Sequence, residues 1–117
     1  MKPVRYAVER KFARYTLDAR AKLTVDGQEI TLRTLDISEG GIALVSPVEI
    51  PDGKSYVVEF VLPAVHGLFR AELEAQNRSG FRYGFQFVAL DESNAALLRK
   101  YERRWGILAK ENQGAKY

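Results

Sequence analysis

Apolar and polar residues alternate along most of the chain before Asp91, and this period of two is typical of strands with one buried face. The alternation covers the segments 18–25, 56–62, 69–76 and 81–87. The predicted inward residues are Ala19, Ala21, Leu23, Val25, Tyr56, Val58, Phe60, Leu62, Phe69, Ala71, Leu73, Ala75, Phe81, Tyr83, Phe85 and Phe87. Each segment is therefore expected to place one face against a core.

A further segment, 28–37, changes its phase along its length. Ile30 and Leu32 follow one phase, whereas Leu35 and Ile37 follow the other. An extra residue between the two pairs would explain the change, because a β-bulge sets two residues of one strand against one residue of its neighbour. We expect such a bulge there, and it would re-aim the residues that come after it.

Two other patterns complete the predicted secondary structure. Residues 41–46 are apolar in character, as in a strand buried on both faces. After Asp91, which can cap a helix, apolar residues recur at steps of three and four. They are Ala95, Leu98, Tyr101, Trp105 and Leu108. A C-terminal helix is therefore expected to lie across the strands through this face and to end near Gly114.

Six short strands separated by turn-forming residues favour an all-β domain with a C-terminal helix, built as a six-stranded antiparallel β-barrel. The chain of 117 residues is long enough for one such domain and too short for two comfortable ones. The expected division is a basic N-terminal arm at 1–15, the barrel with its helix at 16–113, and a tail at 114–117.

Composition narrows the chemistry that this domain could perform. The chain has no cysteine and a single histidine, His66. Disulfides, thiolate nucleophiles and cysteine-based zinc sites are thus excluded, and a histidine-based metal site or catalytic triad would rest on one residue. The sequence therefore predicts a protein that is not an enzyme and that has no catalytic residue, metal site or cofactor.

The N-terminal residues lack the apolar segment of a signal peptide, and no stretch reaches the roughly 18 apolar residues of a membrane helix. A cytoplasmic location without membrane insertion is therefore expected.

Two motifs contain polar residues that could bind a ligand. The net charge is only +3, yet residues 1–15 hold five basic residues and one acidic residue. Within this arm, Arg10 and Arg14 form an R-x-x-x-R motif that also contains Lys11. The spacing occurs three times in the chain and indicates little alone, whereas D-x-S-x-x-G occurs once, as "DISEGG" at 36–41. Support for a ligand site therefore comes from the order and placement of the two motifs together.

A basic arm with R-x-x-x-R, followed by Asp36, Ser38 and Gly41 in D-x-S-x-x-G, a six-stranded barrel and a C-terminal helix, resembles the PilZ family. The resemblance covers roughly residues 9–105. Members of this family are bacterial receptor domains for cyclic di-GMP. The resemblance therefore implies a PilZ-like split barrel with cyclic di-GMP as its ligand.

The resemblance also implies what the residues of the arm do. Arg10 and Arg14 would grip guanine and phosphate, because a guanidinium fork matches the O6 and N7 acceptors of guanine and also pairs with phosphate. Lys11 would add a positive charge without a stacking plane. Glu9 stands where members that take up a stacked pair of ligands often carry a further arginine, and its charge would oppose a second dianionic molecule.

In the D-x-S-x-x-G motif, Asp36 would accept two parallel N–H donors from the other edge of guanine, and Ser38 would add a hydroxyl. Gly40 and Gly41 would permit positive φ and a close approach of the backbone to a flat ligand. Binding would then fold the basic arm over the barrel rim, and a downstream protein partner would recognise the newly covered surface together with the outer face of the helix.

Several alternatives stay open. The 36–41 motif could be an ordinary turn whose side chains bond their own backbone, and the arm could be a solvated basic segment. A PilZ-like barrel could also be a ligand-free structural adaptor. A small barrel that binds single-stranded nucleic acid ranks lower, because most aromatic residues follow the inward phase. Arg78 and Arg82 could line a site, although a polar strand face explains them equally well.

Overall fold

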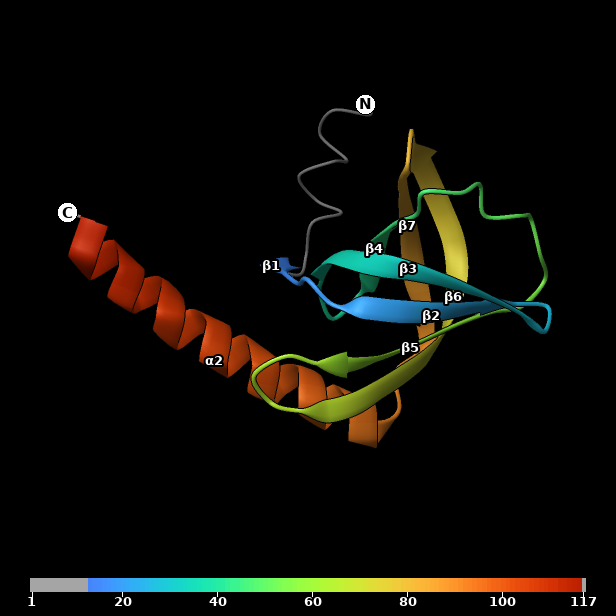
Figure 1. Ribbon diagram of the computed structural model, residues 1–117. Helices are drawn as coiled ribbons and strands as arrows, with labels where there is room; N and C mark the ends of the chain where they lie inside the picture. Colours follow the sequence, from blue (N-terminus) through green and yellow to red (C-terminus); the bar gives the residue numbers. More distant parts are fainter. Residues whose placement is uncertain (1–12, 117) are drawn as a thin grey trace, which may run out of the picture.

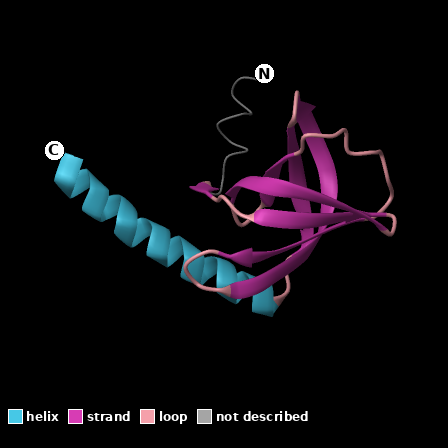
Figure 2. Cartoon of the chain, in the orientation of Figure 1, coloured by secondary structure: helices cyan, strands magenta, loops and turns pink. Residues whose placement is uncertain are grey.

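The computed structural model describes residues 13–116, with side chains through Trp105. Figures 1 and 2 show strands followed by one helix. The elements are β1 (Tyr15–Thr16), β2 (Arg20–Val25), β3 (Gln28–Ile37), β4 (Gly41–Val45), β5 (Tyr56–Leu62), β6 (Gly67–Ser79), β7 (Arg82–Ala89) and α2 (Glu92–Lys116). No helix within the described residues has the length and apolar character needed to cross a bilayer.

Six of these strands form one closed antiparallel barrel. Their order is β3-β2-β5-β6-β7-β4, and pairing of β3 with β4 closes the sheet on itself. Strand β1 lies outside this barrel and pairs with β3 through Tyr15↔Ile37 and Thr16↔Asp36. The predicted six-stranded barrel with a C-terminal helix is confirmed. The short outer strand β1 is an addition that the alternation did not indicate.

The interior of the barrel is filled by the alternating apolar residues. In β5 the buried residues are Tyr56, Val58, Phe60 and Leu62. The rings of Phe60 and Phe69 stack with their centroids 5.2 Å apart, and Phe69 lies 5.7 Å from Phe87. Burial of each such side chain stabilises the fold by roughly 1.5–3 kcal/mol, so this core holds the outer wall in place.

Two residues that were predicted to be inward lie outside the core. Phe81 is 66% exposed because it stands in the β6–β7 turn, directly after Gly80 with its φ of 61°. Ala75 is exposed where β6 has a register shift between Ala75 and Asn77. Alternation therefore predicts the middle of this hairpin correctly and fails where a turn or a bulge interrupts it.

Helix α2 is anchored to the barrel by its first turns. Asp91 caps it as predicted, since its Oδ1 accepts the amide of Asn94 over 2.8 Å. The Asn94 side chain accepts from the amide of Arg70 over 3.1 Å and donates to the carbonyl of Arg70 over 2.5 Å. Leu98 is fully buried against the core. The C-terminal part of the helix extends away from the barrel (Figure 1), so the prediction that α2 lies across the barrel is right only for its N-terminal part.

Candidate functional site

The strand register aligns four residues in a row on the outer wall of the barrel. Asp36 of β3 pairs with Ala43 of β4, and Ala43 pairs with Gly84 of β7. Gly84 in turn pairs with Asn77 of β6. Paired residues on neighbouring strands share a face of the sheet. A carboxylate and a carboxamide thus stand at the two ends of the row, with two small residues as the floor between them.

Asp36 faces outward because β3 contains a bulge. The register with β4 shifts between Thr34 and Asp36. Thr34 and Ile37 both point inward, with exposures of 4% and 0%, although residues three positions apart lie on opposite faces of a regular strand. Leu35 is the extra residue. The predicted bulge is confirmed, at Leu35 rather than just before it, and it directs Asp36 to the outer wall.

Ser38 holds the turn between β3 and β4. Its amide donates to the carbonyl of Gly41 over 2.9 Å, and its hydroxyl oxygen accepts from the amides of Gly40 and Gly41 over 3.1 and 3.3 Å. The carbonyl of Gly40 accepts from the amide of Phe87 over 3.0 Å, which fixes the turn to β7. The hydroxyl oxygen of Ser38 thus bonds its own backbone, as in an ordinary turn, while its hydrogen can still donate to a ligand.

Gly41 is required by packing rather than by conformation. A Cβ on Gly41 would collide with the carbonyl oxygen of Phe85 on β7. Among the described glycines, positive φ occurs at Gly27 and Gly80. Gly40 and Gly41 therefore do not use the positive φ that glycine permits. The close backbone approach expected at Gly41 does exist, but it brings β4 against β7.

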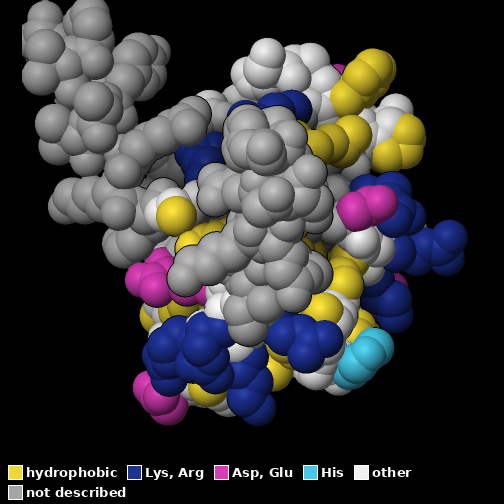
Figure 3. Space-filling view, turned by 90° about the vertical axis from the view of Figure 1, so that its left-hand side faces the viewer, with side chains coloured by type: hydrophobic (Ala, Val, Ile, Leu, Met, Phe, Trp, Pro, Cys, Tyr) yellow, Lys and Arg dark blue, Asp and Glu magenta, His cyan; other side chains and the backbone are white. Residues whose placement is uncertain are grey.

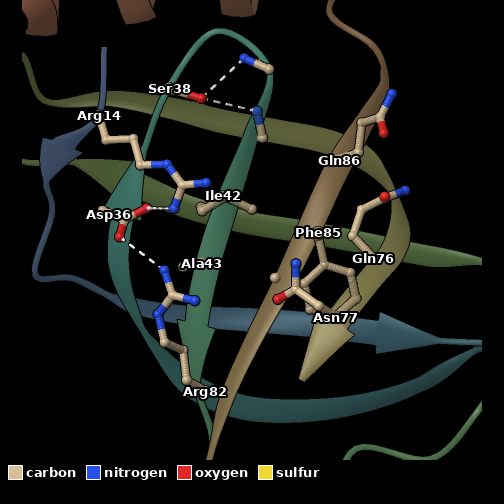
Figure 4. Close-up of a pocket in the computed structure, with 13 residues that line it drawn as sticks. Arg14, Asp36, Ser38, Ile42, Ala43, Gln76, Asn77, Arg82, Phe85 and Gln86 are labelled. Atoms are coloured by element: carbon tan, nitrogen blue, oxygen red, sulfur yellow. Dashed lines mark hydrogen bonds and ion pairs between the residues drawn. The ribbon is translucent and has the colours of Figure 1, made fainter. Parts of the chain in front are cut away.

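Asp36 lies between two guanidinium groups. Its Oδ1 is 3.9 Å from Nη1 of Arg14, and its Oδ2 is 3.5 Å from Nη2 of Arg82 (Figure 4). The three side chains remain partly exposed, at 22% for Asp36, 44% for Arg14 and 39% for Arg82. Exposed ion pairs contribute only about 0–1 kcal/mol to folding. The net positive charge of this cluster suits the binding of an anion.

The cluster borders an open cavity of about 520 Å³ (Figure 4). The predicted site residues that line it are Arg14, Asp36, Ser38, Gly40 and Gly41. The other two predicted residues, Arg10 and Lys11, lie outside the described residues. The volume falls within the range of about 300–1,000 Å³ that is common for small-molecule sites. Two segments that are distant in the sequence therefore meet at a space large enough for a ligand.

Four further residues that line the cavity belong to neither family motif. They are Gln76 and Asn77 from β6, and Arg82 and Gln86 from β7. From the sequence, Arg78 and Arg82 are equally good candidates for lining a site, but their positions in the structure differ. Arg78 pairs with Glu49 over 3.3 Å and lies 4.9 Å from the ring centroid of Tyr83, whereas Arg82 lines the cavity. The pairing of β7 with β4, and of β6 with β7, brings these residues to the predicted ones.

Helix α2 contacts two segments that neighbour the site, β1 and the β3–β4 turn. The hydroxyl of Tyr101 donates to the carbonyl of Thr16 over 2.6 Å, and Thr16 pairs with Asp36. Burial raises the pKa of Tyr101. The pKa of Glu102 is raised mainly by burial and, to a smaller extent, by the carboxylate of Glu39 in the β3–β4 turn. Adjacent residues of the helix therefore lie against β1 and against the turn.

Figure 3 shows the side of the molecule toward which α2 extends. Lys and Arg side chains gather there in larger patches than Asp and Glu side chains. This distribution attracts anions rather than cations to this side of the molecule.

Residues 9–104 match the family model of the PilZ domain. Among solved structures, YcgR of Escherichia coli in complex with c-di-GMP has a TM-score of 0.63 and 18% identity, covering 92% of this chain and 49% of that one. The Bacillus subtilis inhibitor of motility, MotI/DgrA, has a TM-score of 0.61 and 21% identity, covering 81% and 50%. The PilZ domain of Escherichia coli YcgR with c-di-GMP has a TM-score of 0.58 and 17% identity, covering 92% and 97%.

The chain spans about half the length of the first two of these proteins, and at such identities the likeness concerns the fold. A comparison with curated proteins found no match. The family match, in contrast, extends over most of the chain and includes both the arm motif and the β3–β4 turn. The chain therefore belongs to the PilZ domain family.

Proposed function

We propose that this protein is a receptor that binds cyclic di-GMP without transforming it. The main support is that Arg14, Asp36 and Ser38, from the two motifs of the family, line one cavity. The fold adds to it, because the barrel resembles a PilZ domain that was solved with c-di-GMP.

Asp36 is suited to select guanine. Its two carboxylate oxygens accept hydrogen bonds and donate none, and guanine offers two adjacent N–H donors on one edge. Adenine presents an acceptor beside a donor on the corresponding edge, so its pairing with a carboxylate is poorer. Arg14 and Arg82 hold the carboxylate from two sides, which orients it before a ligand arrives.

The positive charges match the two phosphates of the ligand. Arg14 and Arg82 leave the cluster with a net charge of +1 after Asp36 is counted. Arg10 and Lys11 of the arm would add two more charges. Hydrogen bonds that involve a charged group contribute roughly 1.5–3 kcal/mol each, so a few such contacts suffice for tight binding of one dianion. The negative charge of Glu9 would oppose the uptake of a second dianionic ligand molecule.

Arm closure is the step by which binding would become a signal. Arg14 directly precedes β1, and β1 pairs with β3 at Asp36. A ligand held by both side chains therefore joins the arm to the barrel wall. In α2, Tyr101 contacts Thr16 of β1, and Glu102 lies beside Glu39 of the β3–β4 turn. The exposed part of α2 is therefore the surface that we assign to a downstream protein partner.

The alternatives have less support. A ligand-free adaptor has no need of an open cavity with two guanidinium groups at its edge. A binder of single-stranded nucleic acid needs several exposed aromatic platforms. Among the large hydrophobic side chains exposed within residues 13–105, Phe81 is the one aromatic.

Calorimetric titration with cyclic di-GMP tests the proposal, with a single-stranded oligonucleotide as the comparison at two salt concentrations. Oligonucleotide binding releases condensed counterions and weakens with a log–log slope of about −0.7 per neutralised phosphate for single strands. The dinucleotide carries two charges and no condensed atmosphere, so its affinity should fall only modestly. Steeply salt-dependent oligonucleotide binding without dinucleotide binding would favour the nucleic-acid alternative instead.

A further inference from the structure

A second bulge, in β6, places two carboxamide side chains on the same wall of the cavity. Ala75 pairs with Phe85 and Asn77 pairs with Gly84, so Gln76 is the extra residue between them. Neighbouring side chains alternate between faces in a regular strand, whereas a bulge re-aims them. Gln76 and Asn77 accordingly both line the cavity, opposite Asp36 (Figure 4). Bulges are over-represented beside functional sites, which fits this placement.

The Asn77 carboxamide lies over the floor of the cavity. A Cβ on Gly84 would stand 2.5 Å from Oδ1 of Asn77. The missing side chain of Gly84 therefore leaves the space that the carboxamide takes. Ala43, the next residue of the row, carries only a methyl group, so a flat base can lie over Ala43 beside the carboxamide.

Asp36 and Asn77 stand at the two ends of the row. They are separated by three strand spacings, which is about 14 Å along the wall at roughly 4.8 Å per spacing. This exceeds the length of a purine. A guanine paired with Asp36 thus occupies one end of the floor, and the other half of a cyclic dinucleotide extends toward Asn77.

We infer that Asn77, supported by Gln76, contacts the half of the cyclic dinucleotide that Asp36 does not reach, and that it accepts either purine there. The inference rests on the proposed function and deepens it. The ligands of this site then include a mixed cyclic GMP–AMP as well as cyclic di-GMP.

The tolerance follows from the chemistry of the carboxamide. It offers an acceptor oxygen beside a donor nitrogen, and a rotation of 180° exchanges the two. Guanine presents O6 beside N1–H, and adenine presents its N6 amino group beside N7 or N1. Each base thus pairs an acceptor with a neighbouring donor, so the carboxamide matches both. Asp36 offers acceptors alone, so the protein requires guanine at one end of the floor and tolerates either purine at the other.

The test is calorimetric titration of the full chain with cyclic di-GMP, 3′,5′-linked cyclic GMP–AMP and cyclic di-AMP. The parent should bind cyclic GMP–AMP with an affinity within about tenfold of that for cyclic di-GMP. It should bind cyclic di-AMP at least about a hundredfold more weakly than cyclic di-GMP. Asn77→Ala should weaken both guanine-containing ligands by about tenfold. Gln28→Ala is the matched control, because it removes an exposed carboxamide in the β2–β3 hairpin, away from the cavity, and should change nothing.

Two results would overturn the inference. Unchanged affinity of Asn77→Ala for cyclic di-GMP would remove Asn77 from the site, and cyclic GMP–AMP binding as weakly as cyclic di-AMP would exclude tolerance of adenine. Should Asn77→Ala melt at a lower temperature than the parent, Asn77→Ser and Gln76→Ala repeat the comparison. Failure of the parent itself to bind cyclic di-GMP would instead overturn the proposed function as a whole.

Discussion

The guanidinium group of Arg82 on β7 lies 3.5 Å from the carboxylate of Asp36 on β3, across the intervening strand β4. The two residues are far apart in the sequence, and both line the cavity. Because Arg82 is anchored in a barrel strand, it supplies a positive charge whose position does not depend on the N-terminal arm. The barrel wall therefore has its own cation for an anionic ligand.

Replacing Arg82 by alanine should weaken cyclic di-GMP binding by about one to two powers of ten, because one charge-assisted contact worth roughly 1.5–3 kcal/mol is lost. Calorimetric titration measures the change. Arg78→Ala is the control, because Arg78 comes from the same hairpin but pairs with Glu49 instead. Equal losses in the two variants would mean that only overall charge matters, and no loss at Arg82 would exclude it from the site.

The Glu102 carboxyl should make stability depend on pH. Its pKa is raised above the ordinary value of 4.5 by burial and by Glu39, so the folded state holds the proton more tightly than the unfolded state. The stability that comes from this proton is present below 4.5 and is lost as the pH rises through the raised value. Glu102→Gln should therefore melt at a higher temperature than the parent at pH 7, and the difference should shrink toward pH 4. Glu29→Gln, in an exposed hairpin, serves as the control. A difference that stays constant across this range would contradict the coupling.

Gly41→Ala should destabilise the barrel, because the added Cβ meets the backbone carbonyl of Phe85, which cannot move without displacing β7. A cost of about 1–3 kcal/mol is expected for such overpacking, measured by urea denaturation. Gly84→Ala is the matched comparison, since its Cβ meets only the movable side chain of Asn77. Its stability should fall less than that of Gly41→Ala. The reverse order would contradict the packing argument.

Much of this fold could be predicted from local pattern. Strand β5 buries every second residue, as its alternation indicates. In β3, the change of phase between Leu32 and Ile37 reveals a bulge, because a buried face imposes its period on the sequence. The D-x-S-x-x-G spacing likewise marks the turn that lines the cavity. These features depend on residues that are neighbours in the chain.

The far wall of the site could not be predicted in this way. Gln76 and Asn77 look like ordinary exposed residues of a strand. They lie opposite Asp36 only because β6 pairs with β7, β7 with β4, and β4 with β3. The packing role of Gly41 could not be predicted for a related reason. Its neighbour Phe85 belongs to a strand that follows much later in the chain, so the sequence could not show that the close approach is to β7.

Arm closure predicts protection from protease. Trypsin cleaves after Arg10 and Lys11, and saturating cyclic di-GMP should slow these cleavages far more than cleavage after Lys116. Arg14 already lies 3.9 Å from Asp36 without ligand and is not used as a reporter. Brief digestion followed by mass spectrometry measures both, and Lys116 serves as the internal control. Equal rates with and without ligand, in a sample shown to bind, would mean that the signal does not pass through the arm.

The most direct test of the central claim, that Asp36 selects guanine, is the ratio of affinities for cyclic di-GMP and cyclic di-AMP in the parent and in Asp36→Asn. The substitution turns one acceptor into a donor at nearly constant size. It also removes a negative charge, which strengthens phosphate binding equally for both ligands, so the ratio isolates the base. The parent should favour cyclic di-GMP by about a hundredfold or more, and Asp36→Asn should narrow that preference by at least about tenfold. A parent that does not bind cyclic di-GMP, or an Asp36→Asn variant with an undiminished preference, would contradict the claim.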